Sequence, residues 1–225
     1  MKHNILVVVA HPDDETLGAG GTLRKHVLDG DTVNVMSMTD GVGAREDGGE
    51  KEANNRLEAA KEASNIIGFN WIENYNFEDN ALDTYPNLEI IKAIEKIKND
   101  IDPNIVYTHS GGDLNIDHTT VARSVLTAFR PQPKENCKEI RLFEVPSSTD
   151  YGHEEITGRF IPNLFIDINE LWEEKERALK AYGSEMREYP HSRSIDAVKN
   201  LATIRGNQVG LAMAESFQVI RKIIY

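Results

Sequence analysis

The N-terminal segment runs Ile5-Leu6-Val7-Val8-Val9-Ala10-His11-Pro12-Asp13-Asp14-Glu15, an unbroken apolar run that passes directly into a cluster of polar residues. Residues 5–9 predict a strand that is buried on both faces, because a strand with one face in water would alternate apolar and polar positions. Strands of this kind occur in parallel sheets that are covered by helices on both sides. The first strand therefore favours an α/β protein.

The remainder of the chain alternates strand-like and helical patterns, which is typical of βαβ units around a mostly parallel sheet. The helical patterns lie at residues 16–28, 51–67, 88–101, 119–129, 170–182 and 195–210. The further strand patterns lie at residues 33–38, 71–72, 104–108, 140–145 and, as an edge strand, 165–168. Residues 39–50 and 146–163 are predicted as loops, and the second is long enough to suggest a functional role. We expect one domain over residues 1–225.

Composition excludes several classes of partner. The chain has 225 residues and a net charge of −12, which fits poorly with nucleic acid or anionic lipid because both require a basic face. No apolar stretch approaches the roughly 18 residues of a membrane span, and no signal-peptide pattern follows the N-terminus. We expect a soluble, cytoplasmic protein. The lone cysteine, Cys137, cannot form an internal disulfide and is given no role.

Polar residues gather directly after the predicted strands. The first strand leads into His11, the second into Asp40, the fourth into the segment from His109 to Asp113, and the fifth into Ser147 and Ser148. In open α/β sheets the ligand crevice lies outside the carboxyl ends of the strands. The sequence therefore predicts an active site at this edge of the sheet.

A metal site is the first hypothesis for that edge. His11, with carboxylates two and three residues further on in a turn fixed by Pro12, can present a nitrogen and a carboxylate oxygen to a divalent cation. The other carboxylate stays free. A second cluster adds His118, and three protein ligands plus water is the catalytic zinc arrangement. Asp113 or Asp117 could orient an imidazole. The alternative is a plain turn whose aspartate caps the next helix, but two clusters at one sheet edge favour the metal.

The segment from Ala10 to Gly18, followed by Gly20-Gly21-Thr22, resembles the signature of the PIG-L/LmbE-like family of metal-dependent N-deacetylases. Further matches are Arg56-Leu57-Glu58-Ala59, Asp79-Asn80-Ala81-Leu82-Asp83, Asp117-His118 and Pro190-His191-Ser192-Arg193-Ser194. The resemblance spans residues 5–218. It implies a Rossmann-like three-layer α/β sandwich and an enzyme that removes acetyl groups from substrates of the N-acetylglucosamine type.

The resemblance also implies roles for single residues. It places the zinc ligands at His11, Asp14 and His118, with iron as the alternative native metal, and the general base at Asp13. Arg56 and Asp79 match positions that contact sugar hydroxyls in the family; their plainer readings are a surface ion pair and a turn aspartate. The implied substrate is a small N-acetylated amino sugar, linked to a nucleotide or a glycoside. A homo-oligomer is left open.

One position departs from the family pattern. Many members have a histidine three residues before the last zinc ligand, where this chain has Asn115. An amide can donate a hydrogen bond to a developing oxyanion, but it cannot protonate a leaving amine. His109 or His191 must then supply the proton, or Asp13 performs both steps. A histidine satisfied by the backbone is the plainer reading of His109, and a loop residue that of His191.

Other activities fit the sequence less well. The glycines from Gly18 to Gly21 lack the G-x-G-x-x-G spacing of a dinucleotide site and are expected to let a helix pack close to the metal turn. No G-x-S-x-G elbow marks a serine hydrolase. Two alternatives stay open: a metal hydrolase of another acyl group or of an ester, and a sugar-binding protein without turnover. The presence of Asp13 disfavours the sugar-binding protein, since a binding protein does not need a free carboxylate.

Overall fold

The structure, a computed structural model, describes residues 2–44 and 49–224. Its strands are β1 (Asn4–Val9), β2 (Thr32–Thr39), β3 (Asn70–Phe77), β4 (Ile105–His109), β5 (Glu139–Phe143), β6 (Leu164–Asp167) and β7 (Ala214–Lys222). Within the described residues they form one seven-stranded sheet in the order β3-β2-β1-β4-β5-β7-β6. β1 to β5 run parallel, β7 is antiparallel to β5, and β6 is antiparallel to β7. The predicted α/β fold with a mostly parallel sheet is confirmed.

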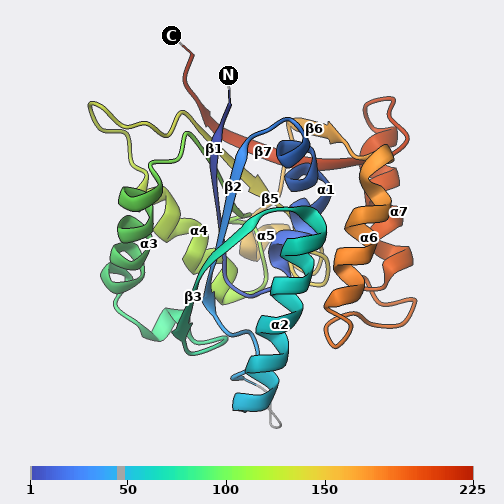
Figure 1. Ribbon diagram of the computed structural model, residues 1–225, viewed down its shortest axis with the longest axis horizontal. Coiled ribbons are helices and arrows are strands. Elements are labelled where there is room, and N and C mark those ends of the chain that lie inside the picture. The colour runs from blue at the N-terminus through green and yellow to red at the C-terminus, as the bar shows by residue number, and fades with distance from the viewer. Residues whose placement is uncertain (1, 45–48, 225) are drawn as a thin grey trace.

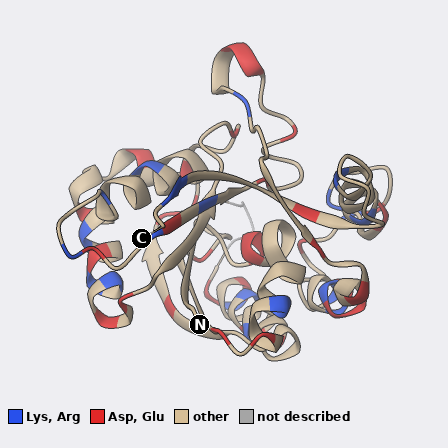
Figure 2. Ribbon diagram, turned by 90° about the horizontal axis from the view of Figure 1, so that it is seen from above, with Lys and Arg blue, Asp and Glu red and all other residues tan. Residues whose placement is uncertain are grey.

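Helices cover both faces of the sheet (Figures 1 and 2). They are α1 (Asp14–Leu28), α2 (Glu50–Ile67), α3 (Asn87–Ile101), α4 (Ile116–Ala128), α5 (Glu154–Thr157), α6 (Trp172–Ala181) and α7 (Ile195–Asn207). Two 3₁₀ turns, η1 (Leu82–Thr84) and η2 (Asn169–Leu171), complete the set in the described ranges. One apolar core lies beneath α1, α2, α6 and α7, and the other lies beneath α3 and α4. Among the described residues, no helix combines the length and apolar composition that crossing a membrane requires.

β1 lies at the centre of both cores. Ile5, Val7 and Val9 face the first core, whereas Leu6 and Val8 face the second, and all five are fully buried. An apolar residue is therefore required at every position of β1, which is the physical reason for the unbroken run. Because β1 is flanked by β2 and β4, the turn that follows it opens at the middle of the sheet edge.

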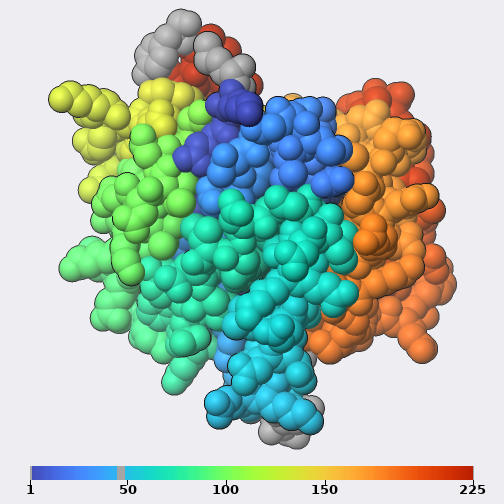
Figure 3. All heavy atoms as spheres, in the orientation of Figure 1, coloured from blue at the N-terminus to red at the C-terminus, as the bar shows by residue number. Residues whose placement is uncertain are grey.

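The glycines of α1 permit close packing, as expected. A Cβ on Gly18 would lie 2.3 Å from the Phe143 ring, and one on Gly21 would lie 2.7 Å from Ile168. The same helix is tied to the C-terminal part of the chain by a buried ion pair. Glu215 accepts hydrogen bonds from the backbone amides of Gly21 and Thr22, and Lys175 Nζ lies 2.7 Å from its Oε1. Figure 3 shows α6, in orange, beside α2, in cyan.

Several predicted boundaries were wrong. The third strand spans Asn70–Phe77, not the two residues expected, and β7 was not predicted at all. The edge strand at residues 165–168 is confirmed as β6. The long loop at 146–163 contains the short helix α5. The helix expected from residue 119 begins at Ile116, because the Asn115 side chain accepts hydrogen bonds from the amides of Asp117 and His118 and so caps it. Of the predicted loop 39–50, residues 45–48 lie outside the described ranges.

Candidate metal centre and active-site cleft

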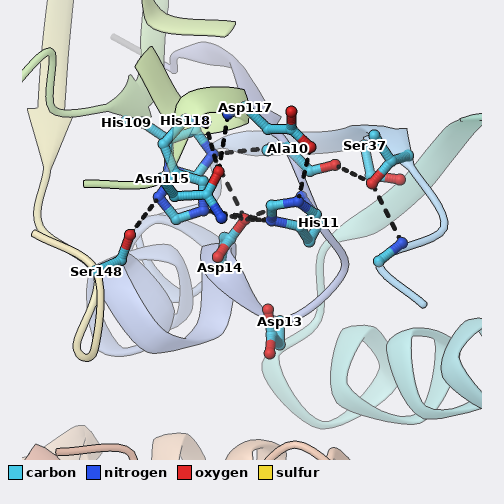
Figure 4. Close-up of polar contacts among 12 residues, drawn as sticks. Ala10, His11, Asp13, Asp14, Ser37, His109, Asn115, Asp117, His118 and Ser148 are labelled. Atoms are coloured by element: carbon cyan, nitrogen blue, oxygen red, sulfur yellow. Dashed lines mark hydrogen bonds and ion pairs between the residues drawn. The ribbon is translucent and has the colours of Figure 1, made fainter. Parts of the chain in front are cut away.

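Three buried donor atoms converge at the carboxyl ends of β1 and β4 (Figure 4). His11 Nδ1 lies 3.2 Å from Asp14 Oδ2 and 3.3 Å from His118 Nε2, and the latter two atoms are 3.4 Å apart. Metal–ligand bonds of 2.0–2.1 Å in a tetrahedral site place ligand atoms roughly 3.3–3.4 Å apart. The donor set predicted from the sequence is therefore brought together with the spacing that a tetrahedral cation requires.

The turn after β1 aims two of these donors. Asp13 adopts a φ of 128°, a conformation that costs a non-glycine residue of order 1–3 kcal/mol and is kept mainly at functional sites. Asp14 then begins α1, and its Oδ2 accepts a hydrogen bond of 2.9 Å from the backbone amide of His11. Asp14 Oδ1 is buried and has no hydrogen-bond partner among the described residues. A buried carboxylate oxygen without a partner is costly, which favours a cation beside this carboxylate.

Carboxylates face the outer nitrogens of both histidines. Asp113 Oδ2 lies 3.1 Å from His118 Nδ1, which also contacts Ser148 Oγ at 3.2 Å. His11 Nε2 lies 3.1 Å from Asp79 Oδ1 and 3.2 Å from Asp117 Oδ2. Such contacts fix the ring orientation of a metal-binding histidine and raise its basicity. The structure thus assigns Asp113 and Asp117, which the sequence left as alternatives, to different imidazoles.

The charges around the donor set suit a cation. Burial alone would raise the pKa of Asp14, but the charge of the neighbouring His118 and hydrogen bonds from His11 and His118 hold this pKa well below its usual range. Burial would likewise lower the pKa of His118, yet Asp14 and Asp113 outweigh it and raise this pKa to about 9. Ionised carboxylates therefore hold protons on the imidazoles, and a divalent cation would replace those protons.

Asp13 is held from one side only. Its Oδ2 lies 3.0 Å from Arg56 Nη2 and 3.2 Å from Arg193 Nη1, whereas its Oδ1 is buried without a hydrogen-bond partner in the described part of the chain. Burial raises the pKa of Asp13, although Arg56 and Arg193 oppose this shift. A carboxylate with one free oxygen and a raised pKa next to a metal ligand is chemically suited to accept a proton.

Arg56 and Asp79, expected at sugar hydroxyls, both line a cleft beside the donor set. Arg56 is 3% exposed and already contacts Asp13, the carbonyl oxygen of Pro12 and Glu185 Oε1. Asp79 contacts His11 and accepts a hydrogen bond from the amide of Ala44. Both residues therefore support the turn and the ligand set from the walls of the cleft.

The three candidates for oxyanion stabilisation or proton supply lie in different places. Asn115 lines the cleft, and only its Oδ1 is used for the cap of α4. His109 is fully buried, accepts a hydrogen bond from the amide of Ala10 and stacks on His118 with ring centroids 4.0 Å apart. Burial and the charge of His118 lower the pKa of His109 to about 3, so it is neutral. His191 packs beside Tyr151 and does not line the cleft.

Two charged residues of the cleft were missed by sequence reasoning. Arg193 lies within the C-terminal motif, but the histidine two positions before it was chosen instead. The available signal was that Arg193 is a cation within the Pro190–Ser194 motif, while the predicted site is rich in carboxylates. Glu185, which is 1% exposed, contacts Arg56 and had no such signal. The cleft has a volume of about 320 Å³ and is lined by His11, Gly41, Ala44, Arg56, Asp79, Asn80, Asn115, Glu185 and Arg193.

The fold and site together define an α/β protein with a candidate catalytic cation site in a polar cleft at the carboxyl edge of its sheet. The family model described as PIG-L, GlcNAc-PI de-N-acetylase, matches residues 6–129, which include all three candidate ligands. The chain therefore belongs to the PIG-L family and is a deacetylase, a hydrolase. The resemblance in the sequence is confirmed.

Individual relatives are similar in sequence or structure to almost the whole chain. The probable N-acetyl-alpha-D-glucosaminyl L-malate deacetylase 2 of Bacillus cereus is 27% identical over 219 residues, which cover 93% of this chain and 96% of the relative. Diacetylchitobiose deacetylase of Thermococcus kodakarensis is 27% identical over 230 residues, covering 96% and 82%. The crystal structure of the conserved protein TT1542 from Thermus thermophilus matches with a TM-score of 0.78 at 24% identity, covering 99% and 97%.

Proposed function

We propose that the chain removes the N-acetyl group from a small N-acetylated amino sugar, linked to a glycoside or a nucleotide, with zinc or iron held by His11, Asp14 and His118. The observation that carries this proposal is the triangle of donor atoms beside Asp13, whose Oδ1 has no protein partner in the described ranges. Two relatives named for deacetylation of amino-sugar compounds support the substrate class. The one sheet formed by the described residues supports a single deacetylase domain over residues 1–225.

The residues would divide the chemistry as follows. When bound, the metal lowers the pKa of a coordinated water to about 7 and polarises the acyl oxygen. Asp13 Oδ1 accepts the proton of the attacking water, and the Asn115 amide donates a hydrogen bond to the developing oxyanion. Asp13 then returns the proton to the leaving amine, because His109 is fully buried and neutral and His191 packs against Tyr151 and accepts a hydrogen bond from the backbone amide of Arg193. Acetate and a free amine leave.

The cleft supports a polar, ring-sized substrate. Its volume of about 320 Å³ lies at the lower end of ordinary ligand pockets. The carboxylate of Asp79 and the amide of Asn80 face it, and these groups suit hydroxyls better than apolar surfaces. A monosaccharide unit carrying the acetamido group is the expected occupant.

Acetate release from a panel of substrates tests the proposal. Free, nucleotide-linked and glycosidic N-acetyl amino sugars, with N-formyl analogues assayed by formate release and acetate esters, are incubated with the protein loaded with zinc, loaded with iron(II) or treated with a chelator. We expect metal-dependent acetate release from at least one N-acetyl sugar. A protein shown to hold metal that releases no acetate from any member of the panel would contradict the proposal.

Three aspartate variants separate the roles. Asp14→Ala should lose bound metal, whereas Asp13→Asn should keep the metal and lose roughly 10²–10⁴-fold in turnover. Asp100→Asn, at an exposed position of α3, is the matched control and should behave as the parent protein. Full activity of Asp13→Asn would show that the base is another group.

A further inference from the structure

Arg193 connects the segment between α6 and α7 to the proposed base. Its Nη1 donates to Asp13 Oδ2 at 3.2 Å, and its Nε donates to Ser147 Oγ at 2.7 Å. We propose that Arg193 is a positioning residue for Asp13, which together with Arg56 holds Oδ2 so that Oδ1 is the oxygen that handles the proton. This inference rests on the proposed function.

The two arginines reach the same oxygen from distant parts of the chain. Arg56 belongs to α2, is 3% exposed and is fixed further by the Pro12 carbonyl oxygen and by Glu185. Arg193 is 20% exposed and lines the cleft. A hydrogen bond between charged groups is roughly twice as strong as a neutral one. The hydrogen bond from Arg193 and the ion pair with Arg56 meet at one oxygen and together oppose rotation of the carboxylate. Arg193 is the more exposed of the two arginines.

The loop after β5 aims Arg193 and also supports the metal centre. Ser147 has a φ of 68°, an unusual backbone conformation for a non-glycine residue, and its hydroxyl accepts the bond from Arg193 Nε. The next residue, Ser148, contacts both Asp113 and His118 Nδ1. Two consecutive serines thus contact Arg193, which bonds the proposed base, and His118, a proposed metal ligand.

The contact of Arg193 with Asp13 explains how the Pro190–Ser194 motif serves the site. The backbone amide of Arg193 donates to His191 Nδ1 at 3.0 Å, so His191 shapes the turn that carries Arg193. The amide of Ser194 donates to the carbonyl oxygen of His191, and Ser194 then caps α7. In this arrangement the histidine of the motif orders the backbone, while the arginine reaches the cleft.

The test uses steady-state kinetics of acetate release with the metal-loaded full chain. Arg193→Ala should lower kcat by about 100-fold, the cost of a misplaced catalytic group, with KM and bound metal unchanged. Added guanidinium should restore part of kcat, because it can occupy the vacated position. Arg193→Lys should be intermediate, since one ammonium cannot replace a fork that bonds two partners. Ser147→Ala should lower kcat in the same direction but less.

Arg187→Ala is the matched control, because its guanidinium lies in the same segment and, among the described residues, bonds to the carbonyl oxygens of Ser184 and Met186 and not to Asp13. It should leave kcat unchanged. A rise in KM with unchanged kcat in Arg193→Ala would overturn the inference in favour of substrate binding, and loss of metal would overturn it in favour of the ligand set. If Arg193→Ala does not fold, Arg193→Lys and Ser147→Ala carry the test. A parent protein without acetate release would refute the proposed function instead.

Discussion

Asp113→Asn should weaken metal binding by roughly 10–100-fold while the protein stays folded. Asp113 is 2% exposed; its Oδ1 accepts from Ser148 Oγ and from the amide of Asn115, whereas its Oδ2 faces His118 Nδ1 and Thr149 Oγ1. An asparagine would keep its carbonyl at the Oδ1 position and turn its NH₂ group toward His118. The charge-assisted hydrogen bond to His118, of order 1.5–3 kcal/mol, would be replaced by two donors facing each other.

That free energy converts directly into affinity, since 1.4 kcal/mol corresponds to a factor of ten. The dissociation constant is measured by competition with a chromogenic chelator at fixed pH, for the parent protein, Asp113→Asn and the exposed control Asp100→Asn. Thermal unfolding in excess chelator reports the effect on the metal-free fold separately. A metal dissociation constant within about threefold of the parent value would refute the view that Asp113 holds His118 for the cation.

Three further variants examine packing, buried charge and the amide at the cleft. Gly18→Ala should destabilise the fold by about 1–3 kcal/mol, because its Cβ would lie 2.3 Å from the Phe143 ring, and thermal unfolding measures this. Lys175→Met leaves Glu215 buried without its cation and should cost about 3–5 kcal/mol, measured by denaturant unfolding. Asn115→Asp keeps the helix cap but removes the amide donor, so turnover should fall by about 10²–10³-fold at unchanged Tm.

Each of these variants has a control within the chain. Gly111→Ala adds a Cβ that meets nothing within 4 Å, so an equal loss in both glycine variants would contradict the packing argument. Lys92→Met, at an exposed position of α3, should be neutral, and Lys175→Met must differ from it. Asn115→Ala should lose both stability and turnover. Parent-like turnover of Asn115→Asp would show that the Asn115 amide does not stabilise the oxyanion.

The parallel half of the fold could be predicted because its signals are local. Each position of β1 faces one of the two cores, so burial on both faces requires five consecutive apolar residues, and this run can be recognised in the sequence. β7 has no such signal: it lies between β5 and β6, but the last five of its nine residues are only partly buried or exposed. Its place in the sheet is fixed by the antiparallel pairing with β5, a contact between residues about 80 positions apart in sequence. β3 is an edge strand whose polar residues hide the pattern.

The same distinction holds for the site. The three ligand candidates could be found because strand ends and a rigid turn place them together, and parallel strands end at one edge. The contacts of Arg193 with Asp13 and of Glu185 with Arg56 could not be predicted, since Arg193 and Glu185 belong to a segment without regular structure that meets the turn only in the folded chain. That His109 is a buried histidine stacked on His118 could not be predicted either, because its complete burial depends on the folded chain.

Because position 115 holds an asparagine, the mechanism that we propose depends on one carboxylate. Asn115 cannot carry a proton, His109 is neutral and buried, and His191 orders the turn before α7. Asp13 is then the group beside the donor set that can both take and return a proton. Burial raises its pKa toward the range in which both transfers are efficient, while two guanidiniums keep Oδ2 fixed and leave Oδ1 free. A histidine at position 115 would add a second proton carrier, so Asn115→His should make turnover less sensitive to the loss of Arg193.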